Sequence, residues 1–311
     1  MGVSFKIKEY LDTVTLNLNQ QQSMGSNLNQ ANVREALAKM ARQHLPKFNS
    51  DLLILDDTII DVDGYPIPLR SYLPSENFAQ LAVFIHGGGG VAGSIEVYNP
   101  IAKRIAQHSN TVVIAIDYRL APEFKYPMGL NDCKFIIENL ALVLMRHHLN
   151  CNLAAITLIG DSAGAGIIVS IVSNEGFVLK NNIKTQVLIY PCLDYTLASK
   201  SVAQFAHGYL LTIAKLEFYY TSYLASSAER QKLSPLFLPL HEQMPRTLIV
   251  VNECDPLHDD GVNYAQRLKL NKSSVEILEM QGMVHPYLFL ESLCELECMD
   301  TYHKISLFIH A

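Results

Sequence analysis

AITLIGDSAGAGIIVSIV, residues 155–172, joins an apolar strand to an apolar helix across a serine flanked by glycines. We expect the strand at Ala155–Ile159 and the helix at Ala163–Val172. The five residues from Gly160 to Gly164 match G-x-S-x-G, in which small residues permit a tight, strained turn. Such a turn raises the Ser162 hydroxyl above the sheet edge, at the positive end of the helix. Ser162 is therefore a candidate nucleophile.

From Asp51 onward, much of the chain alternates between similar strands and helices. Runs rich in Val, Ile and Leu, without polar alternation, are typical of parallel strands covered on both faces. We therefore predict an α/β fold with a mostly parallel central sheet, helices on both faces and an antiparallel edge. The further strands are expected at Leu52–Leu55, Thr58–Val62, Ile67–Leu73, Leu81–His86, Thr111–Ile116, Thr185–Tyr190, Thr247–Val251 and Val275–Met280, and the further helices at Glu96–His108, Gly129–His148, Gly261–Leu270 and 290–309.

Two segments fall outside this alternation. Residues 195–233 contain no convincing buried strand but many aromatic side chains, which indicates a helical insertion. Near the N-terminus, residues 17–32 are rich in Asn, Gln and Ser, and a helix is expected over Val33–Leu45, ending before Pro46. We therefore predict a catalytic core of residues 51–194 and 234–311, with residues 1–50 and 195–233 as helical additions to it.

The composition limits the class of protein. With 49% hydrophobic and 17% charged residues, the 311-residue chain can bury a large core, which excludes a disordered protein. Its net charge is −6 and no basic run is present, so we expect no nucleic-acid partner. The mean hydropathy is +0.14, and the nearly uncharged stretch Leu153–Ser173 is long enough to span a bilayer. Its glycines favour a buried strand, turn and helix instead, so we expect no integral membrane association.

The cysteines and histidines form no recognisable metal site. The six cysteines show no C-x-x-C spacing and lie in apolar segments, as buried thiols do in a reducing compartment. Cys294 and Cys298 can share one helix face, but no His stands near them at ligand spacing. No apolar leader follows Met1, so we expect a cytoplasmic protein. We expect no metal and no cofactor, and the sequence leaves a homodimer open.

A run of glycines follows the expected strand Leu81–His86. His86-Gly87-Gly88-Gly89-Gly90 leaves backbone N–H groups unobstructed, as the binding of an oxyanion requires. The alternatives are a plain loop or a phosphate cradle, but neither G-x-G-x-x-G nor a G-K-[ST] ending is present. An H-G-G-G run of this kind is typical of esterases and lipases.

A serine nucleophile also needs a base and an acid, which follow it in the order Ser, Asp/Glu, His in this architecture. Asp255 comes after the strand Thr247–Val251, and His285 comes after the strand Val275–Met280. Both loops would lie with Ser162 at the carboxyl edge of the sheet, so we favour Asp255 and His285. The rivals are Glu253, Asp259 and Asp260 as acid, the last two being typical of a helix N-terminus, and His258 as base, which follows the acid too closely.

Together these residues resemble the hormone-sensitive-lipase branch of the α/β-hydrolase esterases. The resemblance covers about residues 50–300 and implies the α/β-hydrolase fold, with residues 1–50 and 195–233 forming a helical cap. It also implies that the N–H groups of Gly87, Gly88 and Ala163 form the oxyanion hole. The motifs that carry it are His86–Gly89, Asp117–Glu123 (Asp-Tyr-Arg-Leu-Ala-Pro-Glu), Gly160–Gly164, Asp255–Leu257 and Gly282–His285.

Some positions allow other interpretations or depart from the family. Asp117–Glu123 resembles the segment that buttresses the site, but Arg119 and Glu123 would equally form a structural ion pair. The family often has a bulky residue where this chain has Gly90, so a wider or looser pocket is expected. Some relatives have lost the His and act as receptors, whereas this chain keeps His285.

The predicted reaction is two-step acyl transfer from a small-molecule ester. Ser162 would attack the carbonyl while His285 takes its proton and Asp255 holds the imidazole. The resemblance implies carboxylic esters of short to medium acyl chain. The alternatives are an amidase or peptide hydrolase with the same triad, or a non-catalytic small-molecule receptor. Five residues of the insertion would either line an acyl pocket or only pack the cap, namely Phe205, Tyr209, Leu210, Phe218 and Tyr219.

Overall fold

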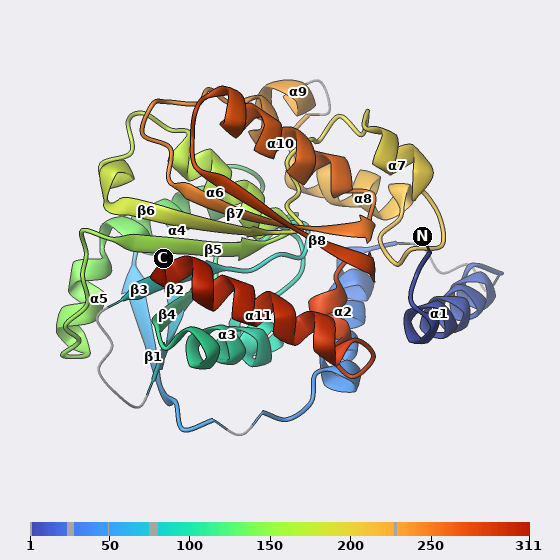
Figure 1. Ribbon diagram of the computed structural model, residues 1–311, viewed down its shortest axis with the longest axis horizontal. Coiled ribbons are helices and arrows are strands. Elements are labelled where there is room, and N and C mark those ends of the chain that lie inside the picture. The colour runs from blue at the N-terminus through green and yellow to red at the C-terminus, as the bar shows by residue number, and fades with distance from the viewer. Residues whose placement is uncertain (1, 24–27, 49, 75–79, 227–228) are drawn as a thin grey trace.

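The computed structural model describes residues 2–23, 28–48, 50–74, 80–226 and 229–311, and it contains an eight-stranded central sheet (Figure 1). The strand order is β1-β2-β4-β3-β5-β6-β7-β8. The β1–β2 and β2–β4 pairs are antiparallel and all others are parallel, which confirms the predicted mostly parallel sheet with an antiparallel edge. The strands are β1 (Leu53–Ile60), β2 (Pro66–Leu73), β3 (Leu81–Ile85), β4 (Val112–Ile116), β5 (Ile156–Asp161), β6 (Ile183–Ile189), β7 (Arg246–Cys254) and β8 (Val275–Val284).

Helices cover both faces of the sheet (Figure 1). Successive residues of a strand point to opposite faces, so Ala82 and Phe84 of β3 pack against α3 and α11, while Val83 packs against the helices of the other face. This double burial explains why the central strands β3 and β4 are apolar at every position. The helices are α1 (Phe5–Ser23), α2 (Gln30–His44), α3 (Ile95–Ser109), α4 (Met128–Glu138), α5 (Leu140–Arg146), α6 (Ala163–Val172), α7 (Lys200–Gln204), α8 (Ile213–Tyr223), α9 (Arg230–Leu233), α10 (His258–Leu270) and α11 (Glu295–His310).

Several elements differ from the sequence prediction. The two short strands expected before Asp63 are one strand, β1, which pairs with β2 along its whole length. The long helix expected at Gly129–His148 is divided at Asn139, whose side-chain amide donates to the Phe135 carbonyl and ends α4. Helix α1 was not predicted, because only Ile7 and Leu11 among its described side chains are buried, while other apolar residues such as Phe5 and Leu16 are exposed and blur the helical pattern. Residues 24–27 of the predicted polar segment lie outside the described residues.

Helices α7, α8 and α9 follow β6 and precede β7 in the sequence, and α8 lies near the carboxyl end of the parallel strands (Figure 1). A separate apolar cluster joins α8 to α2, because Val33 of α2 belongs with Leu216, Tyr220 and Tyr223 of α8. Helix α8 of the insertion and the N-terminal helix α2 therefore pack together. Leu153–Ser173 folds as β5, a turn and α6, and no helix in the described part of the chain has the length and apolarity to cross a membrane.

Candidate active site

Ser162 occupies a strained turn between β5 and α6. Its backbone has φ +50° and ψ −118°, a conformation that costs about 1–3 kcal/mol. The flanking glycines are needed for close approach, because a Cβ on Gly164 would lie 2.0 Å from the Ile85 carbonyl oxygen. On the other side, a Cβ on Gly160 would lie 2.8 Å from the Gly164 carbonyl carbon. The turn therefore fixes the position of Ser162 at the carboxyl edge of the sheet.

Asp255 and His285 lie on the loops that follow β7 and β8, and their side chains share a hydrogen bond of 3.0 Å between Oδ2 and Nδ1. Asp255 is fully buried, and its carboxylate also accepts hydrogen bonds from the Leu257 N–H at 2.8 Å and the Asn252 amide at 3.0 Å. These donors fix the carboxylate, and the carboxylate in turn orients the imidazole. The other ring nitrogen of His285 makes no hydrogen bond within the described residues, and His285 lines the same pocket as Ser162.

The rival acids and the rival base have other partners. The three acids accept hydrogen bonds from backbone N–H groups, and the histidine contacts two carboxylates. The Gly282 N–H donates to Glu253 at 2.8 Å, and the Ser201 N–H donates to Asp259 at 3.0 Å. Asp260 accepts from the Leu193 and Asp194 N–H groups at 2.8 and 2.9 Å. The His258 ring lies 3.2 Å from the Asp259 carboxylate and 3.4 Å from that of Glu279. The structure instead brings the two predicted residues, Asp255 and His285, together.

The glycine run after β3 presents its N–H groups differently from the prediction. The Gly87 N–H donates to the Asp161 carboxylate at 2.7 Å, so it is already engaged and the prediction for Gly87 needs correction. Gly88 and Gly89 have φ of +96° and +66°, which favour glycine, and both line the pocket beside Ser162. Within the described residues, no hydrogen bond uses the N–H of Gly88, Gly89 or Ala163. These three donors are free to receive a charged oxygen.

Asp161 is a site residue that the sequence reasoning missed, although it stands inside the G-x-S-x-G motif. Its carboxyl group is buried and accepts hydrogen bonds from the Gly87 N–H and from the Tyr98 hydroxyl at 3.1 Å. Burial raises the pKa of Asp161 to about 6. The carboxyl group thus joins the nucleophile turn to the glycine loop. His86 also supports that loop, because its Nδ1 lies 2.8 Å from the Gly87 carbonyl oxygen and its ring stacks on Tyr118.

The α/β hydrolase fold family matches residues 82–289 of the chain, a range that includes Ser162, Asp255 and His285. The chain belongs to this family. It is 30% identical to the ethyl acetate hydrolase of Pseudomonas putida over 254 residues, 78% of each chain, and 31% identical to the arylesterase of Saccharolobus solfataricus over 242 residues, 75% of this chain and 76% of that one. The hyperthermophilic esterase of Pyrobaculum calidifontis has the same fold, with a TM-score of 0.84, 26% identity and coverage of 99% and 98%. The resemblance to the hormone-sensitive-lipase branch is confirmed.

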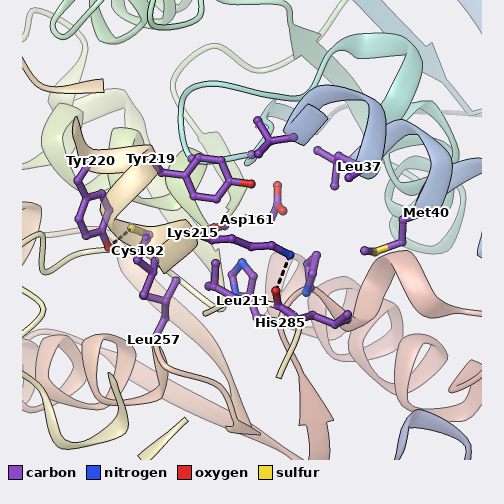
Figure 2. A pocket seen from close by; sticks show the side chains of 18 of the residues that line it. Leu37, Met40, Asp161, Cys192, Leu211, Lys215, Tyr219, Tyr220, Leu257 and His285 are labelled. Carbon is purple, nitrogen blue, oxygen red and sulfur yellow. Dashed lines mark hydrogen bonds between the residues drawn. The ribbon is translucent and has the colours of Figure 1, made fainter. Parts of the chain in front are cut away.

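The pocket of this α/β-hydrolase lies between the strand ends and the helices α2 and α8 (Figure 2). Most of the side chains that line it are apolar. Of the five insertion residues proposed from the sequence, Leu210 and Tyr219 line it, whereas Phe205, Tyr209 and Phe218 do not. The lining residues that were missed include Val33, Ala36, Leu37 and Met40 of α2 and Leu211, Lys215, Leu216 and Tyr220 of the insertion.

Two tyrosines of α8 explain the glycines at the end of the H-G-G-G-G run. A Cβ on Gly89 would lie 2.5 Å from the Tyr219 ring, and a Cβ on Gly90 would lie 2.6 Å from the Tyr223 ring. The expectation that Gly90 widens the pocket is therefore wrong. An aromatic ring from the insertion occupies the space next to Gly90.

The segment Asp117–Glu123 connects the core to α2. The predicted pair between Arg119 and Glu123 is wrong, because Arg119 bonds to Asp132 and Asp61 instead. Glu123 pairs with Arg34 of α2 at 2.7 Å, and the same guanidinium donates to the carbonyl oxygens of Val91 and Ala121. Arg34 therefore fastens α2 to the loops beside the pocket.

The cysteines of the chain form neither disulfides nor a group that could bind a metal ion within the described residues. All six are free, and Cys294 and Cys298 lie on one side of the start of α11 with their Sγ atoms 3.9 Å apart. Over the described ranges, no three His, Cys, Asp or Glu residues are grouped so that they could hold a metal ion.

Proposed function

We propose that this α/β-hydrolase cleaves carboxylic esters through an acyl-enzyme on Ser162. One observation carries the proposal: the strained Ser162 and His285 line one pocket, and His285 is hydrogen-bonded to the buried Asp255. Ser162 attacks the ester carbonyl and His285 takes its proton, then returns it to the leaving alcohol. Asp255 holds the imidazole and stabilises the imidazolium. Water repeats the attack and releases the acid.

The oxyanion hole of the proposed mechanism consists of the N–H groups of Gly88, Gly89 and Ala163. Gly89 replaces Gly87, whose N–H is bonded to Asp161. A preorganised donor of this kind contributes about 10²–10³-fold in rate, because it costs no reorganisation when negative charge develops on the carbonyl oxygen. The N-terminal end of α6 adds its dipole at the same point.

We further propose that residues 1–50 and 195–233 act as a cap that sets substrate size. Support comes from α2 and α8, which supply most of the apolar pocket lining. The relatives named as hydrolases of ethyl acetate and of aryl esters favour small esters. Acyl chains from acetate to hexanoate should therefore react fastest in a 4-nitrophenyl ester series. A maximum at dodecanoate would overturn the size preference.

The test of the nucleophile is the Ser162→Ala variant with 4-nitrophenyl butanoate. Loss of the hydroxyl should abolish the burst and reduce kcat by at least about 10⁴-fold, because no acyl-enzyme can form. Ser170→Ala is the matched control, since Ser170 lies on α6, the helix that follows Ser162, and its hydroxyl donates to the Gly166 carbonyl, away from the reacting groups. More than a few per cent residual activity in Ser162→Ala would show that another residue attacks.

Two other outcomes would change the assignment of function. Turnover of acyl anilides at rates near those of the matched esters would identify an amidase or peptide hydrolase, because the same triad serves both bonds. Failure of a fluorophosphonate to label Ser162 in the folded protein would identify a non-catalytic receptor. We expect labelling at Ser162 and slow or absent anilide turnover.

Two finer points stay predictions from the sequence. A cytoplasmic location fits the six free cysteines, since a reducing compartment keeps thiols unpaired. Fractionation of the native cells, followed by immunoblotting, would test it. A homodimer is left open by the sequence, and sedimentation velocity of the purified chain would decide between monomer and dimer.

A further inference from the structure

Lys215 is the only lysine or arginine among the described residues that line the active-site pocket. It belongs to α8, and its side chain extends across the pocket, as Figure 2 shows. Its Nζ donates one hydrogen bond, of 2.6 Å, to the Leu210 carbonyl oxygen. The surrounding side chains are mostly apolar, among them Leu37, Met40, Leu211 and Leu216.

The ammonium group of Lys215 is incompletely paired. It carries three N–H donors, and the described residues occupy one of them. No carboxylate of the described chain lies within ion-pair distance of it. Asp161 lines the same pocket, but its oxygens accept from Gly87 and Tyr98. Burial without a counter-charge lowers the pKa of Lys215, and an anion beside it would offset that cost.

A second donor faces the same space. The Tyr219 hydroxyl makes no hydrogen bond with any described residue, and its ring points into the pocket from the helix that carries Lys215 (Figure 2). Burial raises the pKa of Tyr219 to about 12, so the hydroxyl keeps its proton at neutral pH. One cation and one neutral donor, set among apolar side chains, suit a carboxylate better than a neutral alkyl chain.

We propose that Lys215 selects esters that carry a second, anionic carboxylate group, which pairs with its ammonium while Ser162 attacks the ester. This inference rests on the proposed ester hydrolysis and names its substrate class as the monoesters of dicarboxylic acids or the esters of hydroxy acids. In the first class the carboxylate lies on the acyl side, and in the second it lies on the alcohol side. The shared chemistry is a carboxylate a few bonds from the ester.

The experiment compares charged esters with neutral esters of similar length. Ethyl hydrogen glutarate is paired with ethyl hexanoate for the acyl side, and 4-acetoxybutanoate with pentyl acetate for the alcohol side. Initial rates are followed by pH-stat at pH 7.5 to obtain kcat/KM. The measured quantity is the ratio of kcat/KM for the charged ester to that for its neutral partner, which cancels changes that affect both equally.

The variants separate charge from packing. Lys215→Met keeps the approximate length of the side chain and removes its charge. Lys215→Arg keeps the charge, so it measures the effect of a change in side-chain shape alone. Lys232→Met is the matched control, because Lys232 is exposed on α9, outside the pocket lining. In the wild type, at least one charged ester should react as fast as its neutral partner. Its ratio should fall about tenfold or more in Lys215→Met and stay within about threefold in Lys215→Arg and Lys232→Met.

Equal losses for charged and neutral esters in Lys215→Met would overturn the proposal and leave Lys215 only as a support for the Leu210 turn. A wild-type enzyme that rejects both charged esters would overturn it as well. A failure of the proposed function is recognised separately, because the wild type would then hydrolyse neither ethyl hexanoate nor pentyl acetate.

Discussion

The floor of the candidate active-site pocket comes from loops that follow β3, β5, β7 and β8, whereas its roof comes from α2 and α8. In the floor, position is fixed by backbone geometry and buried hydrogen bonds, as at Asp255, which accepts from three groups. In the roof, Lys215 and Tyr219 extend into the pocket with donors left over. We infer from this difference that the floor residues determine the reaction, whereas substitutions in the roof can change which substrate binds without moving the reacting groups.

The largest expected effect lies in the floor, at Asp255. Asp255→Asn keeps the shape of the side chain but removes the charge that stabilises the imidazolium, and its amide favours the wrong imidazole tautomer. We expect kcat for 4-nitrophenyl butanoate to fall about 10⁴-fold with little change in KM.

The matched control for this prediction is Asp259→Asn. Asp259 is a rival acid four residues away, which accepts from the Ser201 N–H and contacts His258. It should keep nearly full activity. A comparable loss in both variants would mean that the acid had been misassigned or that the whole loop after β7 had shifted.

The next largest loss of activity is expected at Gly89, where the floor of the pocket contacts Tyr219 of the roof. In Gly89→Ala the new methyl group would lie 2.5 Å from the Tyr219 ring, and φ of +66° is strained for alanine. The glycine loop must move, so we expect kcat/KM for 4-nitrophenyl butanoate to fall about 10²-fold through the loss of an oxyanion donor.

The double variant Gly89→Ala with Tyr219→Ala tests this contact. Removing the ring creates space for the methyl group, so part of the lost activity should return relative to Gly89→Ala alone. The backbone strain stays, and recovery should therefore be incomplete. Strictly additive losses in the double variant would show that floor and roof are independent at this point.

A smaller effect is expected at the buried Asp161, whose ionisation changes the free energy of unfolding with pH. Its pKa is about 6 in the folded protein against 3.8 as reference, so between these pH values the folded chain holds a proton that the unfolded chain has lost. Stability from this group is therefore present below about pH 4 and is lost as pH rises through about 6, by about 3 kcal/mol in total. Asp161→Asn should remove this slope.

The measurement is urea unfolding of the wild type and Asp161→Asn from pH 4 to pH 7.5. The free energy of unfolding of the variant, relative to the wild type, should rise with pH over that range. Other titrating groups cancel in the difference. A constant difference would show that the Asp161 carboxyl group does not titrate between these limits.

The same contrast between floor and roof explains how much the sequence could predict. Ser162, Asp255 and His285 each follow an apolar strand, and parallel strands end at one edge, so local patterns were enough to bring them together. Gly87 was misassigned because its bond to Asp161 joins residues 74 positions apart. The roof depends on such contacts throughout, as between α2 and the insertion, and no local pattern distinguishes a helix side chain that faces the pocket from one that packs.

The smallest expected effect concerns the attachment of the roof. Arg34 of α2 donates to the Val91 and Ala121 carbonyl oxygens and pairs with Glu123, so Arg34→Met should loosen α2 without touching the reacting groups. We expect KM for 4-nitrophenyl hexanoate to rise about threefold to tenfold with kcat unchanged within about twofold, and stability to fall by about 1 kcal/mol. Arg42→Met is the control, because among the described residues Arg42 pairs with Glu35 of the same exposed helix face and with no residue of the pocket. A change confined to kcat in Arg34→Met would mean that the roof acts on the chemistry and not on binding, and the separation of the two regions would fail.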